Sequence, residues 1–82
     1  MEKVIKSIEK GWFKYTYQNK VFRNSKRDYK YVLFFKPIKT KGAEQDGISY
    51  PIALGNNPTT MVSSWKNIFS HGDLKVKEII NA

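Results

Sequence analysis

The stretch "GWFKYTYQNKVFRNSKRDYKYVLFFK" (residues 11–36) decides the fold, because its aromatic and β-branched residues recur at strand spacing. Nine of its side chains are aromatic, and lysines and arginines stand between them. In "WFKYTY", Phe13, Tyr15 and Tyr17 alternate with other residues and share one face of a strand, whereas Trp12 lies on the opposite face. The segment therefore predicts β-structure with an aromatic face.

The end of this stretch, "YKYVLFFK" (29–36), is apolar on both faces at its centre, which predicts an interior strand packed on each side. Pro37 removes a hydrogen-bond donor and should end it. Before it, "QNK" predicts a turn in which Asn19 tolerates positive φ, and "VFR" a short returning strand. "NSKRD" (24–28) predicts a polar, charged loop.

Upstream, "KVIKSIE" (3–9) fits either a helix or a strand, and we favour a strand because an extended segment follows. Gly11 would then occupy a tight hairpin turn. Downstream, residues 39–47 predict a loop. Residues 48–55 predict an extended segment, with Pro51 at a sheet edge or a bulge.

The segment "NNPTTMVSSWKNIFSHG" (56–72) predicts the one helix, with Asn57 as its cap and Pro58 at its first position. Its apolar residues recur at helical spacing, and they are Met61, Val62, Trp65, Ile68 and Phe69. We expect Trp65 to be buried against the sheet. Gly72 should stop the helix, and "LKVKEII" (74–80) predicts a final strand.

Together these elements predict an α+β fold. We expect a small antiparallel sheet of about four to five strands, a helix over about residues 58–70 on one face, and a C-terminal strand. The chain has 82 residues, so it predicts a single domain spanning residues 1–82. It has no cysteine, which excludes disulfides and thiolate metal sites.

The net charge of +8 is concentrated in one half of the chain. Residues 1–42 hold twelve Lys or Arg and three acids, and residues 43–82 hold three Lys and four acids. A one-sided basic half is typical of a protein that binds a polyanion. No apolar run is long enough to cross a bilayer, so we expect a soluble, cytoplasmic protein without a membrane partner.

The leading hypothesis is a small non-enzymatic protein that binds single-stranded or irregular DNA or RNA. One helix can cover only one sheet face, so some aromatic rings should lie exposed beside lysines, where bases can stack on them. The candidate stacking rings are Trp12, Tyr15, Tyr17, Tyr29 and Tyr31. The candidate phosphate contacts are Lys14, Arg23, Lys26, Arg27, Lys30 and Lys36.

Two alternatives remain open. The same segment suits an inhibitor or adaptor of the kind that phages and mobile elements encode, docking on an acidic protein surface. A ribonuclease toxin could use its lysines, arginines and tyrosines, namely Lys14, Tyr15, Arg23, Arg27 and Tyr31.

No catalytic or metal signature is found, and no cofactor is expected. The lone His71 fits a helix C-terminus. The oligomeric state is open, a homodimer included.

Overall fold

Two tight turns fold the first part of the chain into a meander. The computed structural model describes residues 3–38 and 48–82. Lys10 and Gly11 have φ of 52° and 79°, and Gln18 and Asn19 have φ of 52° and 64°. Two consecutive positive φ angles are typical of the type I′ turn, whose twist matches that of paired strands. The predicted hairpin at Gly11, and with it a strand over "KVIKSIE", is confirmed.

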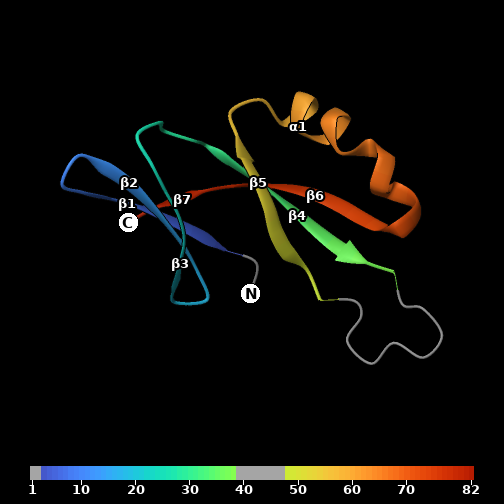
Figure 1. The fold of residues 1–82 in the computed structure, drawn as a ribbon, viewed down its shortest axis with the longest axis horizontal. Helices are drawn as coiled ribbons and strands as arrows, with labels where there is room; N and C mark the ends of the chain where they lie inside the picture. The colour runs from blue at the N-terminus through green and yellow to red at the C-terminus, as the bar shows by residue number, and fades with distance from the viewer. Residues whose placement is uncertain (1–2, 39–47) are drawn as a thin grey trace.

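The described residues form seven strands (Figure 1). Their bounds are β1 (Val4–Glu9), β2 (Trp12–Tyr17), β3 (Lys20–Ser25), β4 (Tyr31–Pro37), β5 (Tyr50–Gly55), β6 (Gly72–Glu78) and β7 (Ile80–Asn81).

The α+β class is confirmed, but these strands form two sheets where the sequence predicted one. The four-stranded sheet has the order β3-β2-β1-β7, and the three-stranded sheet has the order β5-β4-β6. β7 runs parallel to β1, and the other pairings are antiparallel. The connection between Ser25 and Tyr31 carries the chain out of the first sheet, so β4 does not pair with β3 (Figure 1).

The core lies between the two sheets. Val4 and Tyr15 from the four-stranded sheet pack with Val32 and Phe34 from β4, and all four are buried. Leu33 and Phe35 are also buried, on the opposite face of β4. The prediction that this strand is packed on both sides is therefore confirmed.

β5 is an edge strand, as Pro51 predicted. The pairing of β4 with β5 shifts register between Leu33 and Phe34, directly opposite Pro51. Proline cannot donate to the ladder, so an irregular edge tolerates it. The loop predicted over 39–47 lies outside the described residues.

Helix α1 (Pro58–Ser64) contacts β4, β5 and β6 and covers one face of the three-stranded sheet (Figure 1). Asn57 Oδ1 accepts a hydrogen bond from the Thr60 N–H at 3.1 Å, so the predicted cap is confirmed. Met61 is buried over Gly55, where a Cβ would lie 2.8 Å from the Met61 sulfur. Gly55 thus lets the helix approach the sheet closely.

The α-helix is shorter than predicted. After Ser64 the chain continues as a 3-10 helix, η1 (Lys66–His71), and Gly72 ends it as expected. Serines and threonines are weak helix formers, and the tighter 3-10 winding rotates the later side chains away from the predicted α-helical face. The expectation that Trp65 is buried is wrong, because 37% of its surface is exposed.

No helix in residues 3–38 and 48–82 is long and apolar enough to span a membrane.

Candidate nucleic-acid interface

The inner face of the four-stranded sheet packs against β4 in the core. Helix α1 contacts the three-stranded sheet, so the outer face of the four-stranded sheet is open. Trp12 and Lys14 point outward from β2, opposite the buried Tyr15. Cross-strand pairing sets Glu9 beside Trp12 and Asn24 beside Lys14. Three strands thus bring an aromatic ring, a cation, an acid and an amide to one surface.

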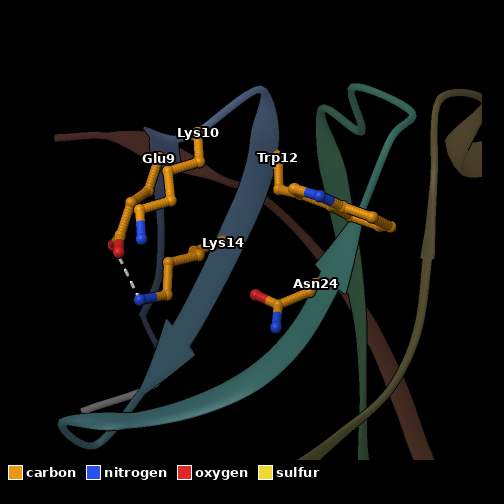
Figure 2. A pocket seen from close by; sticks show the side chains of 5 residues that line it. All are labelled: Glu9, Lys10, Trp12, Lys14 and Asn24. Carbon is orange, nitrogen blue, oxygen red and sulfur yellow. Dashed lines mark hydrogen bonds and ion pairs between the residues drawn. The ribbon is translucent and has the colours of Figure 1, made fainter.

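These side chains surround a hollow of about 300 Å³, which we call the Trp12 hollow (Figure 2). Its lining residues are Glu9, Lys10, Trp12, Lys14 and Asn24.

Trp12 is the aromatic wall of the Trp12 hollow, and 42% of its surface is exposed. The Lys26 ammonium lies 4.5 Å from the centroid of the Trp12 ring. That separation is a cation–π contact, worth about 0.5–1 kcal/mol at an exposed site. The hollow therefore combines an exposed ring with a nearby cation.

The cations around the Trp12 hollow outnumber its acid. Lys10 and Lys14 line it and Lys26 lies over Trp12, whereas Glu9 is the one acidic side chain in the lining. Glu9 accepts from the Lys14 ammonium at 2.8 Å. Both side chains are partly exposed, so this pair contributes about 0–1 kcal/mol.

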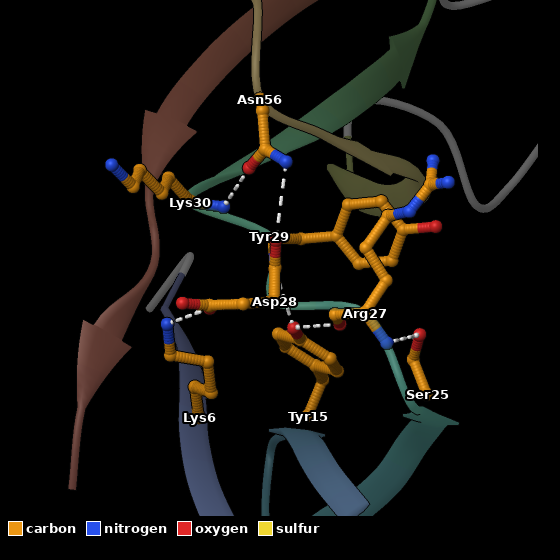
Figure 3. A network of polar contacts seen from close by, with 8 residues as sticks. All are labelled: Lys6, Tyr15, Ser25, Arg27, Asp28, Tyr29, Lys30 and Asn56. Carbon is orange, nitrogen blue, oxygen red and sulfur yellow. Dashed lines mark hydrogen bonds and ion pairs between the residues drawn. The ribbon is translucent and has the colours of Figure 1, made fainter.

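Tyr15 is not a stacking ring, and this part of the sequence prediction is wrong. Its side chain is fully buried, because β2 turns it into the core. Its hydroxyl accepts from the Tyr29 N–H at 2.7 Å and donates to the Arg27 carbonyl at 3.2 Å (Figure 3). Burial raises the pKa of the Tyr15 phenol, while the hydrogen bond from the Tyr29 backbone acts to lower that pKa.

Tyr17 is likewise engaged in packing. Its ring centroid lies 5.4 Å from that of Phe34, and its hydroxyl donates to the Ser49 carbonyl at 3.2 Å. It is half-buried and contacts β4 of the three-stranded sheet, away from the Trp12 hollow.

The connection from Lys26 to Lys30 is held by hydrogen bonds at both ends (Figure 3). The Arg27 N–H donates to Ser25 Oγ at 3.0 Å. Asn56 accepts from the Lys30 N–H at 2.8 Å and donates to the Asp28 carbonyl at 3.1 Å. The loop predicted over 24–28 therefore begins two residues later, because Asn24 and Ser25 belong to β3. We call the connection from Lys26 to Lys30 the platform.

The Asp28 side chain adds an ion pair with Lys6 of β1 (Figure 3). The platform is therefore also tied to the four-stranded sheet.

The other side of this platform faces a second hollow of about 430 Å³, which we call the Trp65 groove. It runs between the platform, β5 and α1, and its walls include Arg27, Tyr29, Gly55, Met61 and Trp65. Tyr29 is half-buried, with its ring centroid 6.1 Å from that of Tyr15. The Trp65 groove again combines exposed aromatic surface with a cation.

The remaining predicted residues lie elsewhere. Lys30 and Tyr31 line a third hollow of about 300 Å³, whose walls also carry acids. Lys36 lines a hollow with Asp73 and Lys75 on the three-stranded sheet. Arg23 is exposed on β3. The structure therefore divides the predicted surface into separate hollows.

The residues considered for a ribonuclease do not converge. Lys14 lines the Trp12 hollow, Arg27 the Trp65 groove and Tyr31 the third hollow, while Tyr15 is buried. Within the described ranges, no three His, Cys, Asp or Glu side chains gather as a metal site would require. His71 ends η1, where the sequence placed it.

Sequence reasoning missed Lys10, Asn24 and Trp65 as site residues. Asn24 belongs to β3, opposite Lys14, but was assigned to a loop. A strand register extended from the "QNK" turn would have found it. For Trp65, the run of serine and threonine before it was the available signal that the helix would not continue.

No protein-family model matches the chain, and no curated protein or solved structure matches it. The function is therefore inferred from the chemistry of the described surface.

Proposed function

We propose that this protein binds single-stranded nucleic acid at the Trp12 hollow, without cleaving it. The observation that carries the proposal is the exposed Trp12 ring with the Lys26 ammonium 4.5 Å from its centroid, on an open sheet face. Rings beside cations are how sequence-tolerant proteins hold single strands, because bases stack on the rings and phosphates meet the cations.

Five side chains in and beside the Trp12 hollow have separate roles in this proposal. A base stacks on Trp12, and the adjoining phosphates lie against Lys14 and Lys26. Asn24 shows no side-chain hydrogen bond to the described residues, so its amide is available to donate to and accept from a base edge. The bound strand displaces Glu9 from Lys14.

A single strand suits this surface better than a duplex. Duplex readers usually place a basic helix in the major groove, and in the described helices Lys66 is the one lysine. In a duplex the bases are already stacked on one another and their faces are covered. The exposed Trp12 ring offers stacking, which only an unpaired base can use.

The test is fluorescence anisotropy with labelled oligonucleotides from about 50 to 200 mM salt. Trp12→Ala should weaken binding by about 1–3 kcal/mol with little change in salt dependence, because stacking releases no counterions. Lys26→Gln should lower the slope of log affinity against log salt by roughly 0.7, the value for one single-strand phosphate contact.

Lys75→Gln is the matched control. It removes the same charge from β6 of the three-stranded sheet, away from the Trp12 hollow. It should leave affinity and slope near those of the parent. Equal loss from Lys75→Gln and Lys26→Gln, or an unchanged affinity for Trp12→Ala, would contradict a site at the Trp12 hollow.

Glu9→Gln adds a change of opposite sign. It removes the carboxylate that occupies Lys14, so binding should tighten and the salt slope should steepen by up to about 0.7. Weaker binding in this variant would show that Glu9 contributes a contact to the ligand.

A second candidate function, docking on an acidic protein, is favoured by an apolar row on the same sheet face. Ile80, Ile5, Thr16 and Val21 lie side by side across the four strands. The three aliphatic side chains are 40–51% exposed. A partner captured from lysate that stays bound after nuclease and high salt, and that loses affinity for Ile5→Ser, would support this candidate.

A further inference from the structure

We infer that the Trp65 groove is a second binding site for the same single strand, so that one strand runs from the Trp12 hollow across residues 26–27 and into the groove. The inference rests on the proposed function and extends it to a ligand several nucleotides long.

Adjacent residues serve the two sites. The Lys26 ammonium lies over the Trp12 ring, while the next residue, Arg27, lines the Trp65 groove. Consecutive Cα atoms are about 3.8 Å apart. Two consecutive residues of one connection therefore contribute a cation beside the Trp12 ring and a cation to the Trp65 groove.

The Trp65 groove, like the Trp12 hollow, has a tryptophan and a cation in its lining. Trp65 is 37% exposed, and Tyr29 and Arg27 line the groove with it. A guanidinium can pair with phosphate or stack on a base, and indole and phenol rings offer π-faces. A nucleotide therefore finds the same two kinds of contact in both hollows.

The connection between the sites is fixed before any ligand binds. The buried Tyr15 hydroxyl donates to the Arg27 carbonyl, and Ser25 accepts from the Arg27 N–H (Figure 3). A ligand that contacts Lys26 and Arg27 together thus loses little affinity to ordering this backbone.

Charge favours a polyanion over an apolar ligand along this path. Lys10, Lys14, Lys26 and Arg27 lie along it, and Glu9 is the acid among the described residues that line the Trp12 hollow or the Trp65 groove. Two aromatic sites at either end favour nucleotides over an acidic peptide, because a peptide would leave the rings without stacking partners.

The inference is tested by length-dependent binding. Oligothymidines of about 4 and about 12 nucleotides are compared, because single-strand sites span about 4–16 nucleotides. Trp65→Ala should lower affinity for the longer oligonucleotide by about 5-fold or more and for the shorter one by less than 2-fold. Trp12→Ala should lower both.

Phe69→Ala is the matched control. Phe69 is an exposed aromatic of η1, at 48%, and does not line the Trp65 groove, so this variant should bind both lengths like the parent. Arg27→Gln is a second variant, since the backbone atoms of Arg27 hold the platform and its side chain lines the groove. It should reproduce the length-selective loss even where Trp65→Ala fails to fold.

The outcomes separate the two proposals. If Trp12→Ala weakens both lengths but Trp65→Ala and Arg27→Gln bind the longer one like the parent, the inference is overturned and the Trp12 hollow stands. If Trp12→Ala changes neither length, the proposed function itself fails. The inference would also be overturned if two protein molecules bound to one longer strand. A third contrary result is that Trp65→Ala weakens binding of poly-glutamate, a peptide polyanion used as a probe, while binding of oligothymidine is unchanged.

Discussion

A single buried phenol joins the core to the proposed binding surface. Tyr15 packs with Val4, Val32 and Phe34, and its hydroxyl holds the backbone of Arg27 and Tyr29. Arg27 and the preceding Lys26 are cations assigned to the ligand. Side-chain packing in the core therefore sets the position of atoms at the surface.

Tyr15→Phe keeps the ring and removes the hydroxyl. The Tyr29 N–H then loses its acceptor, and an unsatisfied buried donor costs about 1–3 kcal/mol. Urea unfolding followed by circular dichroism should show this loss at neutral pH. Tyr50→Phe is the control, because Tyr50 is 46% exposed and its change should stay within about 0.5 kcal/mol.

The stability difference between the parent and Tyr15→Phe should depend on pH. Burial raises the Tyr15 pKa, so the neutral phenol is favoured in the folded state. Its contribution is complete below the unfolded tyrosine pKa of about 10 and is lost as pH rises through the higher folded pKa. The stability difference between the parent and Tyr15→Phe should therefore narrow above about pH 10, whereas lysine titration affects both proteins alike. A constant difference would contradict this assignment.

At the scale of elements, the two type I′ turns set the register of β1, β2 and β3. Gln18 adopts φ of 52° without being glycine or asparagine, which costs backbone energy. Replacing Gln18–Asn19 with Asn–Gly should stabilise the protein by about 1 kcal/mol, measured by thermal unfolding. Gly11→Ala, in the first turn, should instead lower stability.

At Gly11 an added Cβ would meet no atom within 4 Å, so only the φ of 79° opposes alanine. We expect this change to destabilise by about 1–2 kcal/mol. A gain in stability at Gly11, or a loss at Gln18–Asn19, would show that turn geometry does not limit these hairpins.

Strands were predictable from the sequence because alternation of side chains between two faces is typical of extended backbone. Phe13 and Tyr17 pack against the core as their spacing predicted, and Tyr31–Pro37 is the central strand that its two apolar faces indicated. The division into two sheets was not predictable, because strand pairing across Lys26–Lys30 depends on contacts far apart in sequence. The helix prediction failed at Trp65 because α1 ends at Ser64. Trp65 has φ of −113° and ψ of 9°, outside α-helical geometry, so a 3.6-residue period no longer places its side chain.

The candidate site was predicted in composition but not in arrangement. Trp12, Lys14 and Lys26 do meet, because two of them share the outer face of β2 and the third reaches over from the connection. Tyr15 was assigned to the ligand although its own alternation placed it opposite Trp12. Alternation separates two faces of a strand, yet it does not tell which face the rest of the chain covers.

At the scale of the whole molecule, salt should act on stability and on binding with opposite signs. The net charge is +8, and the described residues show two ion pairs, Lys6–Asp28 and Lys14–Glu9. Like charges oppose the compact state, and salt screens them. The melting temperature should therefore rise between about 10 and 200 mM NaCl, by roughly 4–8 °C for each kcal/mol of relieved repulsion.

Oligonucleotide affinity should fall over the same salt range. The double variant Lys36→Gln/Lys75→Gln removes two charges that line one hollow of the three-stranded sheet. It should melt at a higher temperature than the parent at low salt and converge with it at high salt. A melting temperature that falls with added salt would mean that attractive pairs dominate the fold.

The pairing of β7 with β1 sets the order in which the protein can be completed. Ile80 pairs with Ile5, which is made seventy-five positions earlier, and Figure 1 shows β6 and β7 as one path that crosses from one sheet to the other. A ribosome adding about 5–20 residues per second needs roughly 4–15 s to cover that interval. During it, one edge of β1 has no partner from its own chain. An open edge invites pairing with other nascent chains, which charged side chains resist. Lys6 lies within β1, and Lys3 and Lys10 flank it. These charges oppose pairing of the open edge with other chains until β7 has been synthesised.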